Sequence, residues 1–175
     1  TIFLIMRLFY ALTFDEMTID RLIQLQDEQQ GFLYKGKPTM RQNLHLTLCF
    51  LGEQMPEHLD LLHAVLRQLP NKPIKLMFNK IDKFIKQDGL IIWAGIEYNQ
   101  HVLDLHSMIV NQIKASSIVF TDSRFAAHVT LFRRARGTVL PQMQPFSARV
   151  KDISLMQSSS EHGVLTYTRL STIFL

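Results

Sequence analysis

One short pattern occurs twice in the sequence, a histidine and a threonine separated by a single apolar residue. The two copies are His45-Leu46-Thr47-Leu48 and His128-Val129-Thr130-Leu131. Side chains on an extended strand point alternately to opposite faces, so each histidine shares a face with its threonine while the apolar residues point the other way. Each copy therefore predicts a strand with an apolar back and a front that carries an imidazole and a hydroxyl.

The composition places these strands in an ordinary globular chain. The 175 residues are 47% hydrophobic and 19% charged, and this length supports a substantial core. No stretch approaches the roughly 20 apolar residues of a membrane helix, and the apolar residues 1–5, which we interpret as an extension before Met6, lack the basic leader of a secretory signal. The single cysteine, Cys49, excludes an internal disulfide. We expect a reducing compartment, by default the cytoplasm.

Apolar periodicity and turn residues divide the rest of the chain into helices and strands. We expect helices over about 15–30, 56–69 and 99–116, and strands over about 3–13, 43–51, 73–86, 89–97, 127–132, 145–156 and 164–173. Residues 31–41 include Gly36 and Pro38 and show no clear periodicity. They predict an exposed loop, either a plain connector or the border of a site.

The order of these elements repeats along the chain. A strand, a helix and a motif strand occur over residues 3–50 and again over residues 89–132. The repetition predicts two similar lobes related by a pseudo-two-fold axis, which would bring the motif strands face to face across a cleft. We therefore expect an α+β fold in which residues 1–175 form a single bilobal domain, with antiparallel sheet and outer helices in each lobe.

Two imidazoles that face one cleft can act as a matched acid and base. Histidine titrates near about pH 6.5, so one ring can be neutral while the other is protonated. The hydroxyls of Thr47 and Thr130 can donate hydrogen bonds to oxygens on the reacting atom. Arg133, Arg134 and Arg136 crowd just after the second copy, and the net charge is +4. These features favour an anionic ligand, and a phosphodiester suits them best.

Other chemistries fit the sequence less well. Histidines at 58 and 63, and again at 101 and 106, stand five residues apart on expected helices, where ligands to one metal would stand three or four apart. A serine hydrolase would need a Gly-x-Ser-x-Gly elbow, and the sequence has none. We expect no metal and no cofactor, and structural or surface roles for His58, His63, His101, His106 and His162.

Two residues would join the cleft face if the motif strands stay regular. Cys49 would share the face of the first histidine and threonine, although a small buried residue is the favoured interpretation. Phe132 would share the face of the second pair and could stack on a base there, although the core is its default place.

At these residues the sequence resembles a known family. Residues 43–52 (Asn-Leu-His-Leu-Thr-Leu-Cys-Phe-Leu-Gly) and 128–133 (His-Val-Thr-Leu-Phe-Arg) look like the two signatures of the 2H phosphoesterases, specifically the RNA 2',3'-cyclic phosphodiesterases once called 2'-5' RNA ligases. Residues 6–12 are similar to that family's opening strand and residues 167–170 to its closing one. The resemblance covers nearly the whole chain.

The resemblance implies metal-independent opening of a terminal 2',3'-cyclic phosphate to a 2'-phosphate, and it leaves open a reversible 2'-5' RNA ligation as a second activity. By position, His45 would donate a proton to the leaving 3'-oxygen and His128 would accept the proton of water. Thr47 and Thr130 would hold phosphate oxygens, and Arg133 would assist.

Several points stay open from the sequence. Arg134 directly follows Arg133, and either guanidinium could reach the phosphate. The partner would be an RNA or nucleotide with a cyclic phosphate end. We expect the protein to be a monomer and not to bind a membrane. The alternative is a module on the same fold that binds a nucleotide or an RNA end without turning it over.

Overall fold

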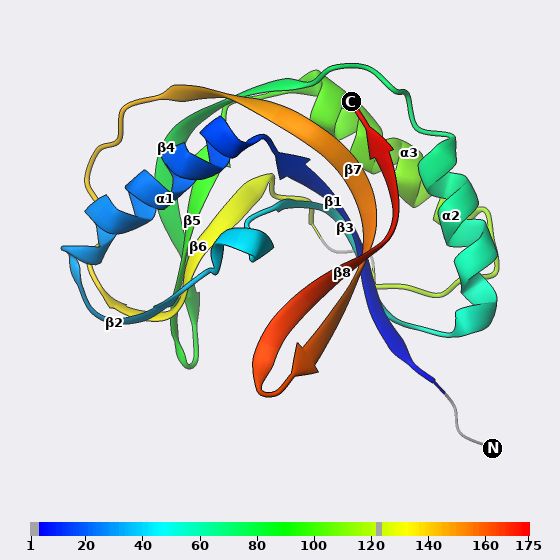
Figure 1. Cartoon of the computed structure of the whole chain (residues 1–175), viewed down its shortest axis with the longest axis horizontal. Helices are drawn as coiled ribbons and strands as arrows, with labels where there is room; N and C mark the ends of the chain where they lie inside the picture. The colour runs from blue at the N-terminus through cyan, green and yellow to red at the C-terminus, as the bar shows by residue number, and fades with distance from the viewer. Residues whose placement is uncertain (1–3, 122–123) are drawn as a thin grey trace.

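The computed structural model describes residues 4–121 and 124–175, and its framework is one antiparallel sheet (Figure 1). In the described residues the strands are β1 (Met6–Phe14), β2 (Leu33–Pro38), β3 (Leu46–Gln54), β4 (Lys75–Lys86), β5 (Gly89–Ile96), β6 (His128–Gly137), β7 (Phe146–Glu161) and β8 (Val164–Phe174). The helices are α1 (Glu16–Gln30), α2 (Leu59–Arg67) and α3 (Gln100–Lys114), with 3-10 turns at Arg41–Asn43 and Pro56–His58.

The sheet divides into two lobes. In the first lobe β1 pairs with β3 and β7, and β7 pairs with β8; in the second lobe β5 pairs with β4 and β6, and β6 pairs with β2. The lobes are joined where the start of β7 pairs with β4 and where Leu46 on β3 pairs with Val129 on β6. The predicted α+β fold with two antiparallel lobes is confirmed.

Helices cover the outside of the sheet and cross between the lobes. Helix α1 follows β1 and packs on β7 and on β2 and β6 of the second lobe, whereas α3 follows β5 and packs on β3 of the first lobe, next to α2 (Figure 1). Each of these two helices therefore contacts the motif strand of the other repeat, β6 for α1 and β3 for α3. No helix in the described ranges is long and apolar enough to cross a membrane.

Local sequence signals explain where the helices begin. The Asp15 carboxylate accepts a hydrogen bond from the backbone N–H of Thr18 at 3.0 Å, and the Asn99 side chain accepts one from Val102 N–H at 3.1 Å. Both residues are N-caps of the predicted helices. Pro56 begins the 3-10 turn that leads into α2, because proline needs no hydrogen-bond partner for its nitrogen there.

The β7–β8 hairpin turns at His162 and Gly163, as expected from the sequence. Both residues have positive φ, 52° and 78°. Positive φ at both central positions is the conformation of a two-residue type I′ turn, whose twist matches that of the strands. The hairpin extends away from the body of the sheet toward the space between the lobes (Figure 1).

Two expectations about the strands need correction. The predicted loop at 31–41 contains β2, which pairs with β6 as an edge strand. Its side chains are mostly exposed, so it lacks the apolar alternation that would reveal a strand. Strand β3 begins after His45 rather than at residue 43, and it continues past Gly52 to Gln54.

The apolar backs of both motif strands lie in the core as predicted. Leu46, Leu48, Val129 and Leu131 are fully buried, and they belong to one hydrophobic cluster with residues from both lobes. The buried hydroxyl of Tyr10 on β1 donates a hydrogen bond to the backbone carbonyl of Leu62 on α2 at 2.6 Å. This packing fixes the position of the opposite face of each motif strand, which carries the histidine and the threonine.

Candidate active site

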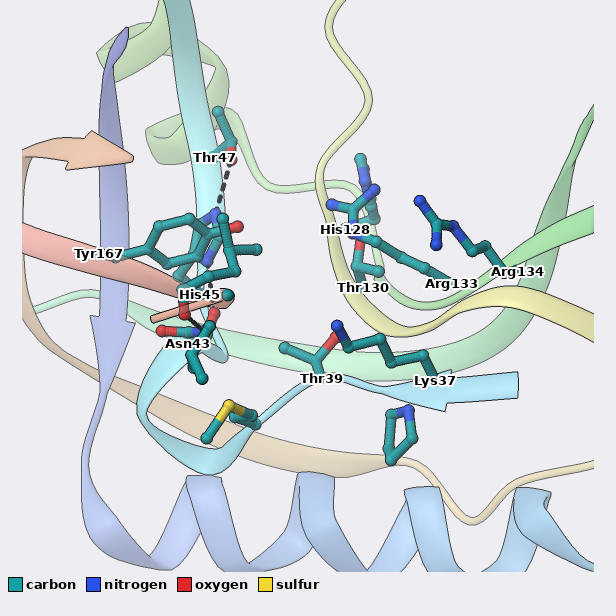
Figure 2. A pocket seen from close by; sticks show the side chains of 15 residues that line it. Lys37, Thr39, Asn43, His45, Thr47, His128, Thr130, Arg133, Arg134 and Tyr167 are labelled. Carbon is teal, nitrogen blue, oxygen red and sulfur yellow. Dashed lines mark hydrogen bonds between the residues drawn. The ribbon is translucent and has the colours of Figure 1, made fainter. Parts of the chain in front are cut away.

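The two motifs meet at the junction of the lobes. Leu46 and Val129, which pair across β3 and β6, are the residues that directly follow His45 and His128. The equivalent residues of the two motifs are thus opposite one another, and both histidines border one cleft of about 440 Å³ (Figure 2). Its lining residues are Lys37, Pro38, Thr39, Met40, Asn43, His45, Thr47, His128, Thr130, Arg133, Arg134, Gly163, Val164, Leu165 and Tyr167.

An irregularity at the same place in each motif strand ends the alternation of faces. The β1–β3 register shifts by one residue at Leu48, and the β5–β6 register shifts by one residue at Leu131. Both leucines stand three residues after the motif histidine. Such a bulge adds one residue to one strand and returns the following side chains to the opposite face.

The bulges confirm the favoured interpretation of both Phe132 and Cys49. Phe132 is buried in the core and does not share the face of His128 and Thr130, so it offers no surface for a base. Cys49 is buried, as its favoured interpretation held. The residues one position further, Phe50 and Arg133, are the ones that return to the exposed side.

His45 is oriented by hydrogen bonds on both ring nitrogens. Its Nδ1 lies 2.7 Å from the carbonyl oxygen of Asn43 and its Nε2 lies 2.9 Å from the Thr47 hydroxyl (Figure 2). A carbonyl oxygen can only accept, so Nδ1 carries a proton, and in the neutral ring the Thr47 hydroxyl donates to Nε2. The rings of Phe9 and Tyr167 pack beside it, with centroids 5.1 and 5.0 Å away.

His128 is held in the same manner by the second lobe. Its Nδ1 donates to the carbonyl oxygen of Ala126 at 2.6 Å, which again lies two residues before the histidine. Phe84 and Trp93 pack against the imidazole with centroids 5.2 and 5.8 Å away. In both motifs the fixed tautomer leaves Nε2 as the nitrogen available for proton transfer.

Burial lowers the pKa of both histidines. For His45 desolvation is the main cause and brings the pKa to about 4, the bond to Asn43 opposes it, and the charges of Arg133 and His128 lower it further. The pKa of His128 is lowered by desolvation and by Arg133, against the bond to Ala126. Both imidazoles are therefore mainly neutral near neutral pH, and an anion in the cleft would raise both pKa values.

The two arginines after the second motif differ in their surroundings. The charge of Arg133 acts on His45, His128 and Tyr167, so its guanidinium lies near all three. Arg134 has a left-handed φ of 51° and its Nε lies 3.4 Å from the Asp88 carboxylate. Both line the cleft, but only Arg133 also lines a second, adjoining hollow of about 570 Å³.

Several cleft residues were not singled out from the sequence. Lys37 and Thr39 come from β2 and the segment after it, which confirms that this segment borders the site. Leu165 and Tyr167 come from the β7–β8 hairpin, and the Asn43 side chain donates to the Leu165 carbonyl at 3.0 Å. Strand alternation gives no signal for Asn43, because this residue ends the 3-10 turn Arg41–Asn43 before β3 begins.

Three of the five remaining histidines make local contacts outside the cleft. His58 bonds with Gln54, His63 with the Ser171 hydroxyl, and His106 with the Leu48 carbonyl. Across residues 4–121 and 124–175, no group of three or more His, Cys, Asp or Glu side chains is placed to hold a metal ion.

Two antiparallel lobes that each present a histidine and a threonine to one cleft define the two-histidine class of phosphoesterases. The chain belongs to the 2'-5' RNA ligase superfamily, whose family model matches residues 19–161.

Relatives in sequence and in structure agree with this membership. The chain is 28% identical over 138 residues to an RNA 2',3'-cyclic phosphodiesterase of Escherichia coli, covering 77% of each chain. It is 26% identical over 162 residues to an RNA 2',3'-cyclic phosphodiesterase of Archaeoglobus fulgidus, covering 87% of this chain and 91% of the relative. The crystal structure of E. coli LigT complexed with 3'-AMP superposes with a TM-score of 0.83 at 25% identity, covering 98% of this chain and 99% of LigT.

Proposed function

We propose that this protein hydrolyses the 2',3'-cyclic phosphate of an RNA end or a nucleotide to a 2'-phosphate, without a metal. The observation that carries the proposal is the convergence of His45, His128 and Arg133 on one cleft with fixed imidazole tautomers. The names of the sequence relatives, RNA 2',3'-cyclic phosphodiesterases, support the same substrate.

In the proposed reaction the two histidines move one proton each. His128, neutral at Nε2, accepts a proton from water as the water oxygen bonds to phosphorus. His45, protonated at Nε2, gives its proton to the 3'-oxygen as the bond from phosphorus to that oxygen breaks. The phosphate stays on the 2'-oxygen, and the site regains its first protonation state when one proton returns to His45 and one leaves His128.

The lowered pKa of His45 sets a condition on this assignment. In the free protein His45 is harder to protonate than an ordinary histidine, because burial and Arg133 disfavour its charged form. A cyclic phosphate carries a negative charge, which favours the imidazolium beside it. On protonation His45 no longer accepts from Thr47, and the Thr47 hydroxyl becomes available to donate to a phosphate oxygen.

Thr130 and Arg133 complete the proposed phosphate site. Thr130 stands two residues after His128, as Thr47 stands after His45, and can donate to a second phosphate oxygen. The Arg133 guanidinium stabilises the charge that grows on these oxygens in the transition state. Arg134, bound to Asp88 at the rim, has the smaller part.

The same groups permit a second reaction of the cyclic phosphate, in which a hydroxyl takes the place of water. If a 5'-hydroxyl of another RNA replaces water, its attack on the cyclic phosphate leaves a 2'-5' phosphodiester, and His128 accepts the hydroxyl proton. This ligation follows from the same proton transfers, and the substrate concentrations decide its extent.

The experiment that tests the proposal is incubation with 2',3'-cyclic nucleotides and oligonucleotides of increasing length, with separation of the 2'- and 3'-phosphate products. Turnover to the 2'-phosphate supports the enzyme. Tight binding of these compounds with no turnover would instead identify the alternative, a module that binds nucleotides or RNA ends on the same fold. A cytoplasmic location, a monomeric state and a single folding domain stay predictions.

A further inference from the structure

Beyond His45 and Thr47 the cleft continues into a second hollow of about 570 Å³. The two hollows share His45, Thr47, Arg133, Leu165 and Tyr167 as walls. The residues found only in the second are Arg7, Phe9, Phe50, Ser158, Ser159 and Ser160. A ligand with its reacting group between the histidines can therefore extend into this space without leaving the cleft.

The strand register aligns hydrogen-bond donors along one wall of the second hollow. Arg7 on β1 pairs with Ser158 on β7, and Ser158 pairs with Tyr167 on β8. Directly opposed residues of antiparallel strands point to the same face of the sheet. A guanidinium, a hydroxyl and a phenol thus form one row across three strands, which we call the Arg7 row.

Arg7 supplies a positive charge that the first motif itself lacks. Phe50 stands five residues after His45, the place that Arg133 has after His128. The Arg7 guanidinium lies over the Phe50 ring, 5.2 Å from its centroid. The first lobe therefore presents an arginine beside the motif position where the second lobe presents Arg133.

Arg7 and Arg133 both act on the hydroxyl of Tyr167. Burial raises the pKa of Tyr167, and the positive charges of both arginines oppose that rise. Tyr167 in turn packs at the edge of His45, 5.0 Å between centroids. The row therefore begins next to the reacting group and continues to Arg7.

We infer that the Arg7 row binds a second phosphate, the one on the 5'-oxygen of the reacting nucleotide. The inference rests on the proposed function, which places the cyclic phosphate between His45 and His128. A cyclic phosphate ends an RNA chain, so the nearest other phosphate is the one on the 5'-oxygen of the same nucleoside. The substrate class that uses the whole site is an oligonucleotide end or a 5'-phosphorylated nucleotide, in preference to a simple nucleoside cyclic phosphate.

Two other charged residues near the cleft bear on where a second phosphate would bind. Glu53 on β3 pairs with Arg7 and places a carboxylate on the same face, which opposes an anion there. Lys37 lines the first hollow and offers a single ammonium to a phosphate. The Arg7 row combines a guanidinium with two hydroxyls, which suits the several oxygens of one phosphate better.

The test compares the affinities of two probes by titration calorimetry, adenosine 3'-monophosphate and adenosine 3',5'-bisphosphate. We expect the added 5'-phosphate to strengthen binding about tenfold, as one hydrogen bond to a charged group does. Arg7→Gln should reduce this gain to less than about twofold, Arg7→Lys should restore part of it, and Glu53→Gln should increase it. Arg21→Gln is the matched control, because Arg21 on α1 also lies over an aromatic ring, that of Phe146, 5.0 Å from its centroid. The Arg21→Gln variant should keep the full gain in affinity.

Two outcomes overturn the inference even if the added 5'-phosphate strengthens binding. One is a gain that Arg7→Gln leaves intact while its thermal unfolding matches the unsubstituted protein, and the other is a gain that Lys37→Gln removes instead. Kinetics then separate the two sources of the phosphate. Values of kcat/KM are compared with that of the cyclic nucleotide without a 5'-phosphate, for its 5'-phosphorylated form and for a dinucleotide cyclic phosphate. Equal increases mean that the phosphate alone is recognised, and a larger increase for the dinucleotide means that an RNA chain is recognised. If the 5'-phosphate strengthens binding but no substrate is hydrolysed, only the proposed function is contradicted. If substrate is hydrolysed but the 5'-phosphate does not strengthen binding, only the inference is contradicted.

Discussion

Leu46 and Val129 pair directly across β3 and β6, and each follows the histidine of its own motif. A pair of equivalent residues on antiparallel strands is what a two-fold relation between two lobes produces at its axis. Both side chains are fully buried, so the pair fixes the distance and orientation of the two motif strands from behind. The active-site geometry thus depends on two residues that cannot contact substrate.

The first prediction concerns this pair. Leu46→Ala should lower the free energy of unfolding by about 3 kcal/mol, because it removes a fully buried side chain and leaves a cavity. It should also lower kcat in the folded protein, since the strands behind the histidines can shift. Urea denaturation measures the change in the free energy of unfolding. The control is Leu61→Ala, at a leucine that is 38% exposed, which should lower the free energy of unfolding far less. Equal costs for the two substitutions would show that the junction does not fix the lobes.

The second prediction concerns the proton transfers. His45→Ala or His128→Ala should each lower kcat by about 10²- to 10⁴-fold, because each removes one general acid or base. The double variant should be little worse than either single variant, since the two groups act in one step. Steady-state kinetics on a cyclic nucleotide measures this, with His101→Ala on α3 as the control. If either single variant kept normal kcat, the paired mechanism would be wrong.

The third prediction separates the two arginines. Arg133→Gln should lower kcat/KM by roughly 100-fold, in the range seen when one donor to a developing oxyanion is removed. Arg134→Gln should cost less than about threefold, because Arg134 is exposed and pairs with Asp88 at the rim. Comparison of kcat/KM for the two variants is the measurement. The opposite order would identify Arg134 as the phosphate contact.

The fourth prediction is a dependence of stability on pH. The folded pKa of His45 is about 4, whereas an unfolded histidine titrates near about 6.5. Between these values the unfolded chain binds more protons, so the free energy of unfolding falls as the pH is lowered through this window. His45→Gln should remove about 2 kcal/mol of the loss between about pH 7 and about pH 4.5. Urea denaturation at both pH values checks this, and an unchanged pH slope would mean that His45 is not buried in its neutral form.

The motif strands show what the sequence could predict about the site. The alternation of faces over His45, Thr47 and their counterparts holds, because two residues of regular strand are enough to set it. It fails three residues after each histidine, at the bulges, and so the alternative in which Phe132 shares the face of His128 and Thr130 is wrong, whereas its default place in the core is confirmed. The adjacent apolar pairs Leu48-Cys49 and Leu131-Phe132 are the trace of these bulges in the sequence.

The parts of the cleft that were missed come from elements without a periodic signal. Strand β2 is an exposed edge strand, so Lys37 stood in an expected loop. Tyr167 reaches His45 only because the β7–β8 hairpin extends toward the cleft, and hairpin direction depends on tertiary packing that a local pattern does not encode (Figures 1 and 2).

The most direct measurement is ³¹P NMR of a 2',3'-cyclic nucleotide incubated with the protein in excess chelator. Two histidines that act on the 3'-oxygen and on water predict the 2'-phosphate as the product, at a rate that the chelator does not change. A 3'-phosphate product would contradict the assignment of the leaving oxygen. Activity that is lost in chelator and restored by a divalent metal would contradict the metal-free mechanism itself.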